Sequence, residues 1–187
     1  MEPVDDVGSS PARDGPDVSA PGGRRLTLVR HAKSDWGEPS LDDFDRPLNR
    51  RGERDAPEMA QRLVAAGLVP TRIVTSPAVR ALATARAFAD AFDYPASRIV
   101  LADDAYLAPP SQLLDVVQRH GGRARHLMLF AHNPGISGFC AALTGEDSLG
   151  EVPTCAVMSL TVPDVEWSRL ALGTGTLDFY DFPKNRR

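Results

Sequence analysis

Two arginines and two histidines stand where they could act together on an anion. Arg30 and His31 directly follow one apolar run, His132 directly follows another, and Arg80 lies five residues beyond a third. A guanidinium is a rigid fork of donors that matches phosphoryl oxygens, and a neutral imidazole can attack phosphorus. Because these residues lack metal-ligand spacing, they indicate an anion site, and phosphate is the anion that fits it best.

This chemistry needs no metal. A transferred phosphoryl group requires positioning and charge neutralisation more than covalent help, and arginines can neutralise its charge without Mg²⁺. Nearby positive charge should also lower the pKa of His31 and keep its ring neutral, which is the nucleophilic form. We therefore expect neither a metal nor a cofactor.

The elements that would position these residues alternate regularly. Apolar runs predict strands and amphipathic stretches predict helices, two of them with Ser76 and Ser111 as N-caps. The expected strands cover 26–29, 72–75, 99–101 and 126–131, the expected helices 52–66, 77–92, 112–120 and 133–143, and a final pair of strands 156–162 and 167–172. This order predicts an α/β three-layer sandwich, with a mostly parallel central sheet, an antiparallel edge and helices on both faces. Since ligands bind at the carboxyl ends of parallel strands, the arginines and histidines should meet in one crevice.

Length and charge indicate the domain organisation and exclude some partners. The chain has 187 residues, enough for one domain and a terminal extension. Residues 1–23 are rich in Pro, Gly, Ser and Asp and carry the whole net charge of −4, so we expect a flexible acidic leader, with the folded domain at 24–187. The neutral remainder offers no electrostatic basis for binding nucleic acid, and no apolar run is long enough for a membrane helix, so neither partner is expected. With no secretion signal at the N-terminus, a cytoplasmic location is expected.

Four segments, taken in order, resemble the histidine phosphatase superfamily, whose fold is that of phosphoglycerate mutase. They are LVRHAKSDW at 28–36, DFDRPLNRRG at 43–52, SPAVRALATA at 76–85 and HNPG at 132–135. The first two are similar to those of the SixA-like phosphohistidine phosphatase branch. The resemblance spans roughly 26–180.

The resemblance implies a role for each matching residue. His31 would be the nucleophile that becomes phosphohistidine, and Arg30, Arg80 and His132 would hold the phosphoryl oxygens. Arg46 matches an additional arginine that faces the pocket in the SixA-like branch.

Trp36 and two aspartates have less definite roles. Trp36 is expected either to line the pocket rim and contact substrate or to pack its loop against the body. Many superfamily members use a carboxylate to protonate the leaving oxygen, and Asp103 and Asp104 are the nearest candidates for a general acid. A weak or missing acid would favour phosphohistidine or another phosphoramidate over an ordinary alkyl phosphate.

Several other polar residues are expected to lie outside the site. Arg50, Arg51 and Arg54 have no counterpart in the resemblance and are expected to be solvated. His120 and His126 are expected to be surface or strand-edge histidines. Cys140 and Cys155 are expected to be buried thiols.

Together these expectations describe a metal-independent phosphatase that works through a phosphohistidine intermediate on His31. Its expected substrate is phosphohistidine or another phosphoprotein, because the short segment between 101 and 111 leaves the pocket open. A phosphatase for small phosphorylated metabolites and a phosphate-binding module without turnover are the alternatives. Nothing in the sequence indicates the oligomeric state.

Overall fold

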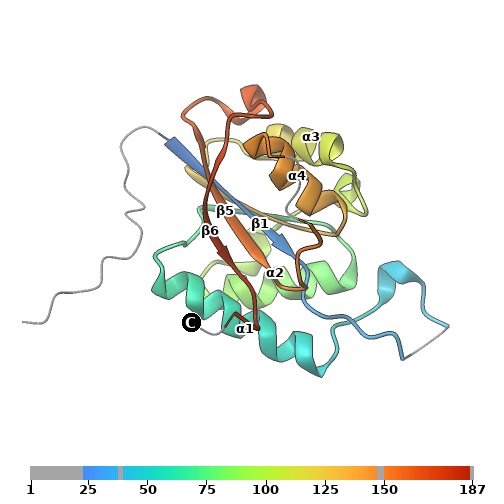
Figure 1. Ribbon diagram of the computed structural model, residues 1–187. Coiled ribbons are helices and arrows are strands. Elements are labelled where there is room, and N and C mark those ends of the chain that lie inside the picture. Colours follow the sequence, from blue (N-terminus) through green and yellow to red (C-terminus); the bar gives the residue numbers. More distant parts are fainter. Residues whose placement is uncertain (1–22, 38–39, 147–149, 186–187) are drawn as a thin grey trace, which may run out of the picture.

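A computed structural model describes residues 23–37, 40–146 and 150–185 (Figure 1). The predicted leader lies outside these residues, except for Gly23, which begins the first strand. Among the described residues, no helix is long and apolar enough to cross a membrane.

Six strands form one sheet in the order β3-β2-β4-β1-β5-β6. Their bounds are β1 Gly23–Arg30, β2 Arg72–Thr75, β3 Val100–Leu101, β4 His126–Ala131, β5 Val157–Pro163 and β6 Thr176–Asp181. The first four pair in parallel, whereas β5 and β6 add antiparallel at one side. The predicted mostly parallel sheet with an antiparallel edge is confirmed.

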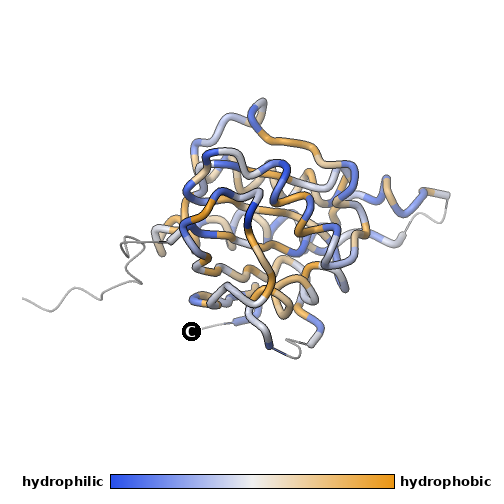
Figure 2. The backbone as a smooth tube through the Cα atoms, turned by 90° about the horizontal axis from the view of Figure 1, so that it is seen from above, coloured by the Kyte–Doolittle hydropathy of each residue, from blue (hydrophilic) through white to orange (hydrophobic). Residues whose placement is uncertain are grey.

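Two helices cover each face of the sheet, as expected (Figure 1). The helices α1 (Arg50–Ala65) and α2 (Val79–Ala91) lie on one face, and α3 (Pro110–His120) and α4 (Gly135–Thr144) on the other. The strand β4 is buried along its whole length because it lies between both layers. Alternate residues of β4 enter opposite apolar cores: Met128 and Phe130 pack with α1 and α2, and Leu127 and Leu129 with α3 and α4. Figure 2 shows hydrophilic and hydrophobic residues alternating along the backbone, as expected for elements that have one face in a core.

The predicted final strand 167–172 is wrong. Trp167–Arg169 form a short 3₁₀ helix, in which Trp167 is buried and its indole N–H donates to the carbonyl oxygen of Ala124 at 2.8 Å. Its ring packs so closely on the end of α3 that a Cβ at Gly121 would lie 2.1 Å from it. The apolar residues of this segment therefore cap a core, and the edge strand is formed by Thr176–Asp181 instead.

The two predicted serine caps are also wrong. The helix α2 begins after Ala78, and α3 begins after Pro109 with Pro110 in its first turn. Proline favours that position because it has no N–H to leave unpaired. The Ser76 side chain is used elsewhere, as described below.

Candidate active site

The carboxyl ends of three neighbouring strands bring the candidate site together. β1, β4 and β2 are adjacent and parallel, and Arg30 at the end of β1 lies opposite Ala131 at the end of β4. His31 and His132 follow directly, and the centroids of their rings are 5.0 Å apart. Arg80 comes from the first turn of α2, after β2, and its Nε lies 3.3 Å from His31 Nε2. These three side chains therefore converge.

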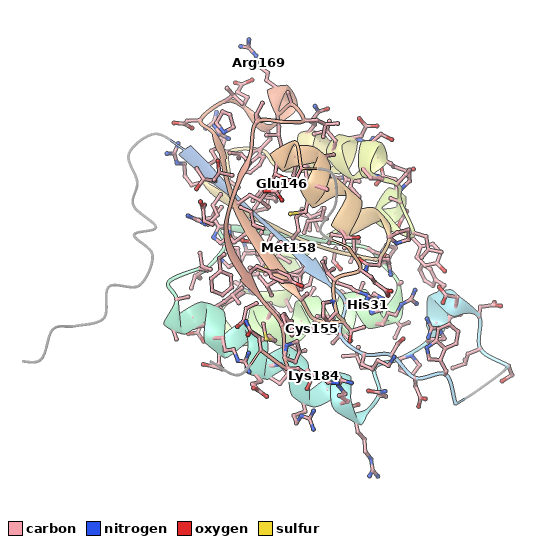
Figure 3. The ribbon with its side chains drawn as sticks, viewed as in Figure 1. His31, Glu146, Cys155, Met158, Arg169 and Lys184 are labelled. Atoms are coloured by element: carbon pink, nitrogen blue, oxygen red, sulfur yellow. The ribbon has the colours of Figure 1, made fainter. Side chains whose placement is uncertain are left out.

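The two ring nitrogens of His31 have different partners. Its Nδ1 lies 2.8 Å from the carbonyl oxygen of Ala32. Because a carbonyl oxygen only accepts, Nδ1 donates its hydrogen there, and the unprotonated Nε2 carries the lone pair that a nucleophile needs. In the structure this lone pair accepts the hydrogen of Arg80 Nε. Figure 3 shows His31 at one end of the sheet and Arg169 at the opposite end.

The ring nitrogens of His132 also differ. Its Nε2 lies 2.8 Å from Ser76 Oγ, and that oxygen already accepts a hydrogen bond from the backbone N–H of Ala78. The Ser76 hydroxyl can therefore donate to Nε2, and we assign the ring hydrogen to Nδ1. This Nδ1 is buried and has no hydrogen-bond partner in the described part of the chain. A buried donor without a partner beside His31 suits the oxygen of an anion.

An aspartate fixes the guanidinium of Arg80. Asp43 lies in the 3₁₀ helix η1 (Asp43–Asp45), in the segment that extends from the body of the molecule after β1 (Figure 1). Its backbone carbonyl accepts from Arg80 Nη1, and its Oδ2 lies 2.8 Å from Arg80 Nη2. The same oxygen accepts from the Tyr106 hydroxyl at 2.7 Å. Arg80 is thereby held on both of its terminal nitrogens.

Arg46 lies on the other side of the Asp43 carboxylate. Its Nε and Nη2 donate to Asp43 Oδ1 at 3.0 and 2.8 Å, and its Nη1 donates to Ser34 Oγ at 2.9 Å. The Arg46 guanidinium carbon lies 3.5 Å from the ring centroid of Trp36, which is itself 71% exposed. Trp36 therefore covers Arg46 from the solvent side and is not packed in the interior.

Arg30 lies at the edge of the site. Its Nη1 donates to the carbonyl oxygen of Val152 at 2.6 Å and lies 3.4 Å from Glu151 Oε1. Its Nε is buried and has no hydrogen-bond partner among the residues that the structure describes. Arg30 therefore still has a donor for a ligand.

Burial and positive charge keep both imidazoles neutral. Burial lowers the pKa of His31 to about 4, and the charges of Arg80, Arg30 and Arg46 act in the same direction against the hydrogen bond to the Ala32 carbonyl. Burial likewise lowers the pKa of His132 to about 3. At neutral pH, His31 therefore has the protonation state of a nucleophile.

The aspartates expected as general acids have no observed link to this site. Asp104 pairs with Arg119 of α3, and Asp103 is exposed at the start of the 3₁₀ helix η3 (Asp103–Ala105). In the described ranges, no hydrogen bond or ion pair joins either carboxylate to His31 or Arg80. Asp43 is the carboxyl group that the structure places at the site. Its partial burial would raise its pKa, but hydrogen bonds from Tyr106, Arg46 and Arg80 outweigh this effect and hold the pKa well below the usual range.

Sequence reasoning missed Asp43 and Tyr106 as parts of the site. Asp43 is one of several acidic residues between 35 and 45, and only its position three residues before Arg46 could have singled it out. Tyr106 lies in a connecting segment, yet its ring packs edge-on to that of His132, with centroids 5.4 Å apart.

The remaining polar residues lie outside the site. Arg51 and Arg54 at the start of α1 both pair with Asp55, and Arg50 is exposed. The expectation for His126 is wrong, because this residue is buried between Thr27 and Val69, with hydrogen bonds of 2.7 and 3.0 Å. Burial lowers its pKa to about 4. Both cysteines are buried and free, as expected.

Comparisons with known proteins support this picture. The family described as histidine phosphatase superfamily (branch 1) matches residues 26–100. A protein of Agrobacterium tumefaciens assigned as the phosphohistidine phosphatase SixA is 28% identical, with a TM-score of 0.70 over 84% of this chain and 96% of that one. The protein histidine phosphatase SixA complexed with tungstate is 21% identical, with a TM-score of 0.72 over 86% and 98% of the two chains, and so shows the fold alone.

One curated relative matches only in part. An uncharacterized chloroplastic protein of Arabidopsis thaliana is 51% identical over 57 residues, which are 30% of this chain and 26% of that protein. The chain thus aligns with about a quarter of that relative.

The fold, the matched region and the similar structures agree: over residues 26–100 and in its fold, the chain resembles the histidine phosphatase superfamily. Its fold is also that of the SixA structures, which are similar to it over most of the chain.

Proposed function

We propose that this chain is a metal-independent phosphatase in which His31 is phosphorylated during turnover. The observation that supports this most is the state of His31: its Nδ1 hydrogen is donated to the Ala32 carbonyl, and its unprotonated Nε2 accepts from Arg80 Nε, one of the groups that would hold the phosphoryl oxygens. In the first step Nε2 forms a bond to phosphorus while the leaving group departs with the electrons of the bond that breaks. In the second step water attacks the phosphohistidine and releases inorganic phosphate.

The donors around His31 fit the charge of a phosphoryl group. Arg80 keeps hydrogens on both terminal nitrogens beyond those donated to Asp43, because each nitrogen carries two. His132 Nδ1 and Arg30 Nε are buried donors without partners in the described residues. Preorganised donors of this kind stabilise charge in the transition state and supply the neutralisation that a metal would otherwise provide.

The proposed substrate is a phosphorylated protein, with phosphohistidine favoured. An alkoxide leaving group needs a proton, and Asp43, the carboxyl group at the site, is held in its ionised form. A phosphorylated imidazole can leave without an added proton when its second nitrogen is already protonated. Parallel assays of a phosphohistidine protein and a panel of phosphorylated metabolites test this preference, and equal rates would contradict it.

Activity itself is tested with p-nitrophenyl phosphate in the presence of EDTA. The wild-type protein should hydrolyse it and should take up a label that is acid-labile and base-stable. His31→Ala should abolish both the turnover and the label. His120→Ala is the matched control, because His120 lies at the far end of α3, close to the charge of Arg72 at the start of β2. Label that persists in His31→Ala would refute the proposal, and binding of phosphate without turnover would indicate a binding module.

A further inference from the structure

A pocket of about 530 Å³ adjoins the phosphoryl site. Its lining includes Arg30 and Asn133, the neighbours of His31 and His132 in sequence, together with Ser137, Gly138 and Glu151. Because Arg30 belongs to both the pocket and the candidate site, a group attached to a bound phosphoryl can extend into this space.

The orientation of the Asn133 amide is determined by its neighbour. Its Nδ2 donates to the carbonyl oxygen of Val152 at 3.2 Å, and the same carbonyl accepts from Arg30 Nη1. A carbonyl oxygen only accepts, so the amide nitrogen must face it and Oδ1 must face the other way. This Oδ1 is buried and has no hydrogen-bond partner within the described residues.

A phosphoryl group cannot satisfy this oxygen. Phosphoryl oxygens in the dianion are acceptors, as is Asn133 Oδ1, and a buried acceptor that stays unpaired in the complex lowers affinity. An N–H or O–H of the leaving group would supply the donor that Asn133 Oδ1 lacks among the described residues.

The acid-base state of the site restricts this donor further. Both oxygens of Asp43 are occupied by Arg46, Arg80 and Tyr106, so the leaving group must depart without a proton from that carboxyl. A phosphorylated imidazole whose second ring nitrogen carries hydrogen meets both requirements. Glu151, whose exposed carboxylate belongs to the pocket lining, suits its positive charge.

We propose that this pocket is the leaving-group subsite and that Asn133 Oδ1 accepts the N–H of the second ring nitrogen of a phosphorylated imidazole. This assignment rests on the proposed function. When His31 Nε2 attacks phosphorus, the P–N bond breaks and its electron pair stays on the ring nitrogen. The ring leaves as neutral imidazole with its hydrogen still on the other nitrogen, so no proton is transferred. Asn133 Oδ1 favours this substrate because it accepts a hydrogen bond from that ring N–H.

The test compares two substrates, in one of which a methyl group replaces that hydrogen. N-phosphoimidazole can donate from its second nitrogen when protonated, whereas its N-methyl derivative keeps the positive charge and cannot donate. For the wild-type protein below the pKa of the phosphoimidazole ring, we expect kcat/KM to be about tenfold or more higher for the N–H substrate. Asn133→Ala should make the two substrates nearly equal and change the hydrolysis of p-nitrophenyl phosphate much less.

Gln118→Ala is the matched control, because Gln118 also donates from its amide to a backbone carbonyl, that of Leu170, away from the pocket. It should keep the preference of the wild type. Equal kcat/KM values for the two substrates in the wild type would overturn the subsite and leave the phosphatase intact. A preference that survives in Asn133→Ala would also overturn it. Failure of the proposed function is recognised separately, because p-nitrophenyl phosphate would then not be hydrolysed at all.

Discussion

At the scale of single residues, Asp43 links the parts of the candidate site. Its Oδ1 accepts from Arg46, its Oδ2 accepts from Arg80 and Tyr106, and its backbone oxygen accepts from Arg80. A carboxylate accepts about four hydrogen bonds. Asp43 is therefore saturated and acts as a positioning residue for the arginines, since it has no lone pair left for substrate.

Asp43→Asn should lower kcat more than it raises KM. The amide can accept on one side only, so either Arg46 or the pair of Arg80 and Tyr106 loses a charge-assisted hydrogen bond. We expect a loss of roughly 10- to 100-fold in kcat, as for one or two such bonds. The KM should change little, because removing a negative charge also favours an anionic substrate. Steady-state kinetics with p-nitrophenyl phosphate measure both, with Asp45→Asn in the same short helix as control. An unchanged kcat would contradict the positioning role.

The lowered pKa of His31 predicts activity in acid. A pKa of about 4 means that the nucleophile binds a proton only in more acidic solution than an ordinary histidine does. After correction for ionisation of the substrate, kcat/KM should stay level from pH 7 to about pH 5 and fall near pH 4. A decline centred near pH 6.5 would show that burial and the arginines do not act on His31 as described. Circular dichroism at each pH checks that the protein is still folded.

The residues that the sequence could predict are those whose place follows from chain direction. His31 and His132 end apolar runs, and strands that run in parallel bring such ends together. Asp43 and Asn133 could not be predicted, because their importance depends on which partners they meet. The number of free lone pairs on each oxygen is a property of the folded arrangement, not of spacing along the chain.

At the scale of elements, α1 and the segment after β1 meet at a glycine. A Cβ at Gly52 would lie 2.2 Å from the backbone oxygen of Lys33, which also accepts from the N–H of Asn49, the N-cap of α1. The backbone cannot move aside as a flexible side chain would. This contact holds the start of α1 against Lys33, which is two residues after His31 in the sequence.

Gly52→Ala should therefore destabilise the protein and reduce activity. Overpacking against backbone costs about 1–3 kcal/mol, and the displaced segment carries both Lys33 and Asp43. Urea unfolding and p-nitrophenyl phosphate hydrolysis measure the two effects. Gln61→Ala on the exposed side of α1 is the control and should be close to neutral. A fully active, equally stable Gly52→Ala protein would show that the contact is not tight.

The sequence predicted most elements because their apolar periodicity is clear, and it failed where tertiary packing overrides local signals. Serine is a residue type that favours the N-cap. The Ser76 hydroxyl instead forms a hydrogen bond with His132, and the helix that follows begins at Val79. The segment around Trp167 has the apolar pattern of a strand, but the Trp167 side chain packs against Gly121 at the end of α3. In both cases a distant partner decides the structure.

At the scale of the whole molecule, three buried histidines couple folding to pH. The pKa values of His31 and His126 are lowered to about 4 and that of His132 to about 3. The unfolded chain, with histidine pKa values near 6.5, binds more protons between pH 6.5 and 4. The buried histidines therefore do not reduce the free energy of unfolding above pH 6.5. As the pH falls through this window, the free energy of unfolding should decrease.

Urea unfolding at pH 7, 5.5 and 4.5 measures this decrease. His126→Gln should flatten the dependence, whatever it costs at pH 7, because one of the three groups no longer titrates. A dependence as steep as that of the wild type would contradict the assignment to His126.

The position of Cys155 affects when the site can form during protein synthesis. Figure 3 shows Cys155 at the same end of the sheet as His31, and its backbone N–H lies 3.1 Å from the carbonyl oxygens of both Arg30 and His31. Both strands that pair with β1, β4 and β5, come from the second half of the chain. A ribosome must therefore translate well past residue 155 before the nucleophile is anchored. A nascent chain that exposes only the segments around His31 and Arg80 should have no phosphatase activity until the last third of the chain has left the ribosome.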